Sequence, residues 1–248
     1  MEQRKPYKKG MEYSYTLGAF PTIELLKCRP QDAQEVYVHS TFPERETIEQ
    51  LCKPYGIPVL VNDKLIAKLS DKENCYVIGI VKKFTCQLSA DKSHIVLVNP
   101  SNMGNLGTII RTAVGLGIKN IAIISPGVDV FHPKALRASM GALFRVQLAY
   151  YDSFEAYRAE FPEHEVFCFM LNAKRQLTVS NCPKPALFSL VFGNEATGLP
   201  DEYKEKGTSI IIPQTEDVDS LNLTIAVGIG TYLFMQNGQG DACSTEDV

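Results

Sequence analysis

The run Leu187-Phe-Ser-Leu-Val-Phe-Gly-Asn-Glu-Ala-Thr-Gly-Leu-Pro200 is the most informative about the fold, because it joins a strand that is apolar except for Ser189 to a turn bounded by glycines. A strand with apolar side chains on both faces needs helices on both faces of its sheet, as in parallel α/β proteins. Such sheets bind ligands at the carboxyl ends of their strands, where this turn lies. Glu195 in the turn is either an acceptor that fixes the loop or a site residue, since a sheltered carboxylate must find donors.

Alternating strands and helices surround this run. The downstream part predicts strands over residues 95–98, 121–124, 165–171 and 209–212, and helices over residues 105–116 and 221–235. The upstream part has shorter, mixed runs that indicate a small α/β unit, with helices over residues 20–27 and 44–55 and strands over residues 35–39, 57–61 and 76–81. We therefore expect a small α/β domain (1–85), a linker (86–92), a parallel-sheet domain (93–236) and an acidic, disordered tail (237–248).

The net charge gives little information about the partner. The 248 residues carry a formal charge of −3, and Asp241, Glu246 and Asp247 of the tail account for all of it. The remaining chain is neutral, so bulk charge neither favours nor excludes nucleic acid. The densest basic stretch is Arg4, Lys5, Lys8 and Lys9, which is simplest to interpret as a solvated or disordered arm, with a nucleic-acid contact as the alternative.

The cysteines and the N-terminal sequence indicate a cytoplasmic setting. Seven cysteines form no CxxC pair and have no nearby histidine to complete a zinc set, so we expect reduced thiols and no metal. The start MEQRKPYKKG lacks the apolar core of a signal peptide, and no apolar stretch approaches the length of a membrane span.

Two further loops follow predicted strands. The first is Asn99-Pro-Ser-Asn-Met-Gly-Asn-Leu-Gly-Thr-Ile-Ile-Arg111, whose free N–H groups could hold an anion, although it fits neither GxGxxG nor a P-loop. The second is Ile210-Ile-Ile-Pro-Gln-Thr-Glu-Asp-Val-Asp-Ser-Leu-Asn-Leu-Thr224. Taken locally, a role as helix N-cap is enough to explain either Ser220 or Asn222. The following helix contains Gly228 and Gly230, which cost about 1 kcal/mol each relative to alanine and indicate close approach of another backbone or subunit.

The three loops in this order resemble the three motifs of the SpoU (TrmH-like) branch of the SPOUT RNA methyltransferases. The elements are N-x-G-x-x-x-R ending at Arg111, G-N-E-x-x-G-L from Gly193, and I-P-(x)6-S-L-N ending at Asn222, and residues 134–142 also resemble a segment of that group. Residues 1–83 are similar, more loosely, to the ribosomal-protein-like RNA-binding domain that precedes many of these enzymes.

The resemblance implies transfer of a methyl group from S-adenosylmethionine to a ribose 2′-hydroxyl of RNA. It also implies a parallel sheet with a C-terminal trefoil knot and a homodimer that packs through the knotted domain. Ribosomal RNA is the expected substrate and transfer RNA the alternative. The implied cofactor contacts are Gly193, Ile212 and Leu221, and the implied catalytic positions are Asn105, Arg111, Glu195, Ser220 and Asn222.

Two roles remain open for Arg111. A guanidinium is a poor general base, whereas a bidentate grip on the phosphate beside the target ribose is physically easier. Lys134 and Arg137 are expected RNA contacts or, equally, ordinary exposed charges.

The third motif departs from the usual pattern of the branch at Gln214, where a methionine normally follows the proline. In addition, the carboxylates of Glu216, Asp217 and Asp219 would repel phosphate unless they point away from it. The main alternative is a catalytically silent protein of the same fold, which binds RNA but does not methylate it. A methyltransferase for protein or a small molecule is disfavoured by the N-terminal domain, and a dinucleotide oxidoreductase lacks the glycine fingerprint and its acidic ribose ligand.

Overall fold

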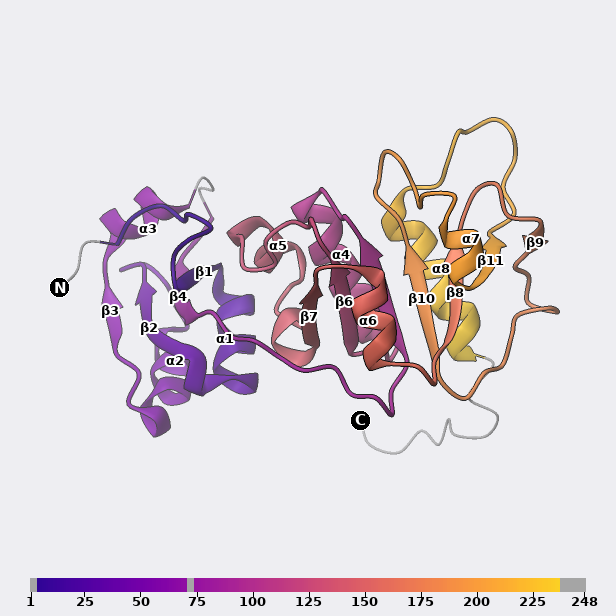
Figure 1. Ribbon diagram of the computed structural model, residues 1–248. Coiled ribbons are helices and arrows are strands. Elements are labelled where there is room, and N and C mark those ends of the chain that lie inside the picture. Colours follow the sequence, from indigo (N-terminus) through magenta and orange to yellow (C-terminus); the bar gives the residue numbers. More distant parts are fainter. Residues whose placement is uncertain (1–3, 71–73, 237–248) are drawn as a thin grey trace. The chain divides into compact units, whose positions relative to one another are not determined.

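The computed structural model describes residues 4–70 and 74–236, and the acidic tail predicted over residues 237–248 lies outside this part (Figure 1). The chain divides into two compact units. The first comprises Met1–Cys86, Asn102–Arg111 and Val128–Val146, and the second comprises Gln87–Ser101, Thr112–Gly127 and Gln147–Val248. Two segments of the expected parallel-sheet domain are thus grouped with the N-terminal residues.

The first unit is built on a four-stranded sheet of order β1-β4-β2-β3. β2 pairs with β3 in parallel, while β1 and β2 both run antiparallel to β4. Its strands are β1 (Tyr13–Leu17), β2 (Ala33–Val38), β3 (Val59–Val61) and β4 (Val77–Lys82). Its α-helices are α1 (Ala19–Cys28), α2 (Arg45–Cys52), α3 (Asp63–Leu69) and α5 (Pro133–Ala138), with 3₁₀ turns at Pro30–Asp32, Lys53–Tyr55 and Ala142–Arg145.

Both faces of the small sheet are covered. Val36 and Val38 of β2 pack with Leu26 of α1 and Ile48 of α2, whereas Tyr37 between them packs on the other side with Ile66 of α3. This separation follows from the alternation of side chains along a strand. The helices and strands expected from the sequence have counterparts in this unit, and β1 and α3 are additional to them.

The second unit contains a seven-stranded sheet of order β7-β6-β5-β10-β8-β11-β9, in which every pair is parallel. The strands are β5 (His94–Val98), β6 (Asn120–Ile124), β7 (Gln147–Tyr151), β8 (Glu165–Phe169), β9 (Arg175–Gln176), β10 (Phe188–Phe192) and β11 (Thr208–Ile211). The helices are α6 (Phe154–Glu160), α7 (Tyr203–Lys206), α8 (Leu223–Gln236) and the end of α4 (Met103–Gly115), whose residues through Arg111 belong to the first unit.

Helices cover both faces of this sheet, as the apolar strands predicted (Figure 1). Cys168 of β8 belongs to the cluster that contains Phe154 of α6 and Tyr203 of α7. Phe167, one position earlier, packs on the opposite face, where its ring centroid lies 4.8 Å from that of Phe234 in α8. The parallel α/β fold is therefore confirmed.

A buried polar network closes the amino ends of the central strands. The Nδ1 of His94 lies 2.8 Å from the hydroxyl of Tyr157, which lies 2.6 Å from Ser189 Oγ, and His164 Nδ1 lies 3.0 Å from the same Oγ. Both Nε2 atoms face main-chain carbonyls, those of Ser89 and Ala90. Burial lowers the pKa of His94 to about 4 and also lowers the pKa of His164, so both rings are neutral at pH 7.

Three further findings bear on the expectations from composition. The six cysteines within the described residues form no disulfide. In the same part of the chain, no group of three His, Cys, Asp or Glu side chains could hold a metal ion. None of the helices placed there is long and apolar enough to cross a membrane.

Candidate active site

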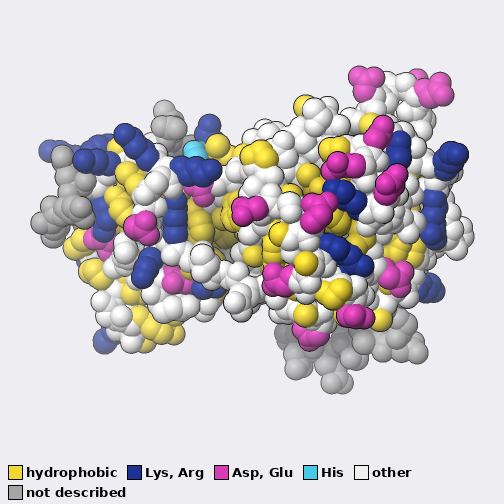
Figure 2. All heavy atoms as spheres, in the orientation of Figure 1, with side chains coloured by type: hydrophobic (Ala, Val, Ile, Leu, Met, Phe, Trp, Pro, Cys, Tyr) yellow, Lys and Arg dark blue, Asp and Glu magenta, His cyan; other side chains and the backbone are white. Residues whose placement is uncertain are grey.

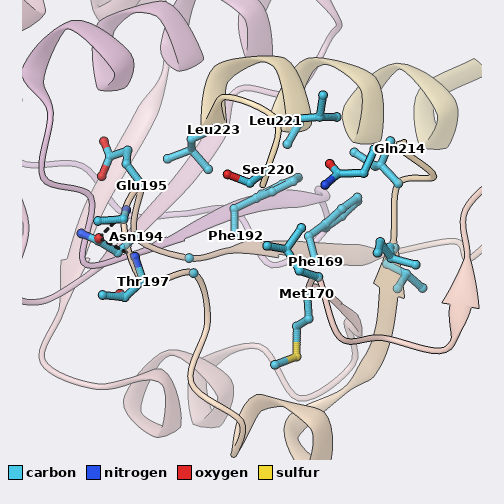
Figure 3. A pocket seen from close by; sticks show the side chains of 18 residues that line it. Phe169, Met170, Phe192, Asn194, Glu195, Thr197, Gln214, Ser220, Leu221 and Leu223 are labelled. Carbon is cyan, nitrogen blue, oxygen red and sulfur yellow. Dashed lines mark hydrogen bonds between the residues drawn. The ribbon is translucent and has the colours of Figure 1, made fainter. Parts of the chain in front are cut away.

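A cavity of about 190 Å³ opens at the carboxyl ends of β8, β10 and β11 in the second unit. Three segments build it: residues 169–171, residues 192–198, and residues 210–226 in part. Figure 3 shows Asn194, Glu195 and Thr197 at the left of the pocket and Gln214 at the right, with Ser220 and Leu221 above the rings of Phe192 and Phe169. The pocket thus lies where parallel sheets bind ligands.

Two stacked aromatic rings form the base of this pocket. The rings of Phe169 and Phe192 are 4.2 Å apart with an interplanar angle of 18°. A Cβ on Gly230 of α8 would lie only 2.5 Å from Cζ of Phe169, so the absence of a side chain lets α8 approach the stack. Packing within the chain therefore explains Gly230, whereas Gly228 has only an ordinary contact of 3.6 Å with the methyl group of Thr112.

The turn after β10 folds back on its own backbone. A Cβ on Gly193 would lie 2.1 Å from the carbonyl carbon of Gly198 and 2.3 Å from the nitrogen of Leu199, so no larger residue fits. Main-chain hydrogen bonds close the turn in both directions, from Asn194 to Gly198 (3.2 Å) and from Gly198 to Asn194 (2.9 Å). Gly198 has a φ of 66°, the left-handed region that glycine adopts easily.

Side chains of this turn hold the loop that follows β5. Glu195 Oε2 accepts hydrogen bonds from the main-chain nitrogen of Ser101 (2.9 Å) and from its hydroxyl (2.7 Å). Asn194 donates from Nδ2 to the carbonyl of Asn99 over 2.7 Å. Glu195 therefore fixes a loop, as one of its two interpretations expected, and it also lines the pocket.

The third loop supplies the remaining wall. Ser220 and Leu221 line the pocket, and the side chain of Gln214 donates to the carbonyl of Asp219 over 3.4 Å. Asn222 caps α8, because its Oδ1 accepts from the nitrogen of Thr224 at 2.8 Å. The capping prediction is confirmed for Asn222, while Ser220 faces the pocket (Figure 3).

The acidic run of this loop does not enter the pocket. Glu216, Asp217 and Asp219 are exposed, and none of them is among the lining residues. These three carboxylates therefore do not place negative charge inside the cavity, where the sequence suggested that they could repel a phosphate.

The predicted site residues divide between the two units. Gly193, Ile212, Leu221, Glu195 and Ser220 all line the one pocket, and Asn222 caps the helix that follows it. The other four lie in the first unit: Asn105, Arg111, Lys134 and Arg137. Sequence reasoning missed Phe169 and Met170, because the end of a buried strand carries no signal that separates a pocket base from ordinary core.

Two main-chain N–H groups at the start of α4 are already hydrogen-bonded within the loop. Asn102 Oδ1 accepts from the nitrogens of Gly104 (2.8 Å) and Asn105 (3.0 Å), so these two N–H groups are not free to bind an anion. Here the expectation of an anion cradle was wrong, because the N-cap takes the donors first.

Gly107 of the same helix permits close packing within the first unit. A Cβ there would lie 2.4 Å from the carbonyl oxygen of Ala135 and 2.6 Å from the Cβ of Ala138, both in α5. The glycine of the first motif thus seats the helix that carries Arg111 directly on α5. Arg111 is exposed, and no carboxylate of residues 4–70 or 74–236 pairs with it.

Lys134 and Arg137 lie on α5, whose first turn is capped by the ring of His132. Nδ1 of His132 accepts a hydrogen bond from the main-chain nitrogen of Lys134 at 3.2 Å. The Nδ1 atom must therefore be unprotonated. Burial lowers the pKa of His132, and this favours the capping form. Lys134 is exposed and Arg137 is half-buried.

Comparison with known proteins identifies several methyltransferases that are similar to this chain. Ribosomal RNA small subunit methyltransferase G 2 of Syntrophobacter fumaroxidans is 35% identical over 143 residues, which are 58% of this chain but only 27% of that protein. The 23S rRNA (adenosine(1067)-2′-O)-methyltransferase of Streptomyces azureus is 26% identical over 208 residues, covering 80% of this chain and 77% of that protein.

A solved structure and a family model agree with these relatives. The AdoMet-bound rRNA methyltransferase from Sinorhizobium meliloti superposes with a TM-score of 0.74 at 25% identity, over 91% of this chain and 87% of that one. The model of the SpoU rRNA Methylase family matches residues 92–232, a span that includes all three loops. The chain therefore belongs to the SpoU rRNA Methylase family.

Proposed function

We propose that this chain is an RNA ribose 2′-O-methyltransferase that uses S-adenosylmethionine, acts on ribosomal RNA and works in the cytoplasm. The observation that carries the proposal is that the second and third motif loops meet in one pocket, where Gly193, Ile212 and Leu221 lie together. The names of the relatives support the reaction and the substrate class, and the absence of disulfides among the described cysteines is consistent with a reducing compartment.

The pocket suits S-adenosylmethionine by shape and chemistry. Its walls offer apolar surface from Phe169, Ile210 and Leu221, which fits an adenine ring, beside the main-chain groups of the turn that begins at Gly193. Polar side chains at Glu195, Gln214 and Ser220 can meet ribose hydroxyls and the charged end of the molecule. When bound, the cofactor supplies an electrophilic methyl group on its sulfonium.

The protein must then place the ribose oxygen and accommodate its proton. Arg111 is the candidate for a bidentate grip on the phosphate next to the target ribose, because its guanidinium is exposed and has no carboxylate partner in the described chain. With Arg111 as a clamp, phosphate or solvent takes the proton. Glu195 orients the loop after β5, and Asn222 fixes the start of α8. Asn105 and Ser220 are the other two catalytic positions that the resemblance implies.

Two finer features of the family belong to this proposal, a C-terminal trefoil knot and a homodimer. The tight turn at Gly193 and the loop that leads to α8 are the segments that would form the knot. On α8, Ile225 is 53% exposed and Tyr232 is 50% exposed. They lie seven residues apart, hence on one face of the helix, and this apolar face supports packing against a second copy.

The glycine of the turn provides a test of the cofactor pocket. In Gly193→Ala the new Cβ collides with backbone atoms at Gly198 and Leu199, so the turn must open and affinity for S-adenosylmethionine should fall at least tenfold by calorimetry. Gly115→Ala is the matched control, because a Cβ at that position meets no atom within 4 Å. Equal affinities of the two variants would contradict the assignment of this pocket.

The role of Arg111 is tested by methyl transfer from labelled S-adenosylmethionine to protein-free 16S and 23S ribosomal RNA, with transfer RNA in parallel. Arg111→Ala should lose at least a hundredfold in turnover while cofactor affinity stays within twofold, and Arg111→Lys should recover little because the planar fork is lost. Lys119→Ala removes an exposed charge elsewhere and should behave as the wild type. Turnover retained in Arg111→Ala would remove the residue from the mechanism.

The dimer is tested by sedimentation of Ile225→Glu, which places a charge on the proposed face. This variant should sediment as a monomer where the wild type sediments as a dimer. Val179→Glu, at a valine that is 78% exposed, is the control and should leave the dimer intact. A wild-type monomer, or a dimer unaffected by Ile225→Glu, would rule out this interface.

A further inference from the structure

We propose that residues 4–10, called the basic arm below, form a fixed phosphate-binding strip that holds the substrate RNA beside the helix of Arg111. The proposal rests on the function proposed above, since it names a surface on which the RNA lies. It differs from the sequence expectation of a solvated or disordered arm, because the structure ties the arm down at both ends.

The start of the arm is bound to the small sheet and to α3. Arg4 donates from Nε to Glu35 of β2 over 2.7 Å, in an ion pair whose partners are both about 15% exposed. The main chain takes part as well, because the ammonium of Lys68 donates to the carbonyl of Arg4 over 3.2 Å and the hydroxyl of Tyr15 donates to the carbonyl of Lys5.

The end of the arm is bound to the segment that precedes α5. The hydroxyl of Tyr7 donates to Asp129 Oδ2, and the ring of Tyr7 meets that of His132 edge to face at 5.6 Å. Lys83 donates to the carbonyl of Lys9 over 2.6 Å and lies 3.6 Å from the carboxylate of Asp129. These contacts all lie within the first unit.

The tethers leave the lysine side chains of the arm unused. They involve Arg4, Tyr7 and main-chain carbonyls, whereas Lys5, Lys8 and Lys9 are exposed and pair with no carboxylate in the described part of the chain. Residues 4–10 contain no acidic side chain. Figure 2 shows Lys and Arg side chains gathered on this side of the unit. A row of unpaired cations on an ordered backbone suits a polyanion, since the backbone loses little entropy on binding.

The strip continues toward the predicted catalytic helix. His132, which packs against Tyr7, caps α5 at Lys134, and Lys134 is also exposed. α5 in turn packs on α4 at Gly107, four residues before Arg111. Cations of the arm, Lys134 and Arg111 therefore belong to one connected set of elements within the first unit. An RNA held along the arm would be presented to the helix that carries the predicted phosphate clamp.

The reach of the strip matches several nucleotides. The arm ends in a turn, in which the nitrogen of Met11 donates to the carbonyl of Lys8, so its extended part (residues 4–8) spans at most about 18 Å, the reach of about three phosphates. Each phosphate neutralised by a lysine steepens the fall of log K with log salt by about 0.7 for single-stranded RNA. Loss of Lys5, Lys8 and Lys9 together should therefore reduce the slope of log K against log salt by about 2.

The test measures binding of protein-free 16S and 23S ribosomal RNA by the full chain across a salt series. The combined variant Lys5→Ala, Lys8→Ala, Lys9→Ala should bind at least tenfold more weakly at 150 mM salt, with the reduced slope. The control removes three exposed lysines elsewhere, Lys27, Lys53 and Lys119, and should retain the wild-type slope. Tyr7→Phe keeps every charge but loses the bond to Asp129, so it should weaken binding severalfold with the slope unchanged.

The outcomes separate this proposal from the enzymatic one. Equal losses in the arm variant and the control would overturn the strip, as would a wild-type chain that binds no RNA. If the arm variant loses RNA binding but the wild type transfers no methyl group, the strip stands and the methyltransferase assignment fails. If the arm variant binds and methylates RNA as the wild type does, only the strip fails. Calorimetry with S-adenosylmethionine should give the same affinity for all variants, because the pocket lies in the other unit.

Discussion

The carboxylate of Glu195 joins two loops that are far apart in sequence, by accepting two hydrogen bonds from Ser101. Charge-assisted hydrogen bonds of this kind are roughly twice as strong as neutral ones. β10, which leads into the turn of Glu195, pairs with β5 on one side and β8 on the other, so this contact fixes the carboxyl edge at the middle of the sheet. The contact between Gly193 and the backbone of Gly198 then leaves one shape for the turn, and the pocket follows from it.

The residues of the proposed cofactor pocket and of the proposed RNA surface lie in different compact units. The second unit holds a narrow pocket with a stacked aromatic base and no lysine or arginine among its lining residues. The first holds Arg111, Lys134 and the basic arm, whose cations suit a phosphate backbone. The proposed cofactor site is narrow and mainly apolar, whereas the proposed RNA surface is cationic and exposed. The neutral charge of the body is consistent with this division, because recognition then depends on local patches rather than on bulk attraction.

Much of the parallel sheet could be predicted, because its strands are mostly apolar and the turns that follow them carry the motifs. The pocket positions Gly193, Ile212 and Leu221 were named through the resemblance, and the structure places them together. Other features depend on tertiary contacts that leave no local pattern. The seven-residue helix α3 is too short for a clear period, Phe169 resembles any core residue, and the ordering of the arm depends on Glu35 and Asp129, which are distant in sequence. The predicted anion cradle failed because Asn102 satisfies the donors locally.

The central claim is that the chain places a methyl group on a ribose of RNA. Mapping 2′-O-methylated nucleotides in ribosomal and transfer RNA from cells with and without the gene tests it most directly. A single ribosomal nucleotide that loses its methyl group when the gene is absent, and regains it when the wild-type gene is restored, is the expected result. Identical maps for both RNA classes, with the protein present in the wild-type cells, would contradict the claim and favour an RNA-binding protein that retains the fold without the reaction.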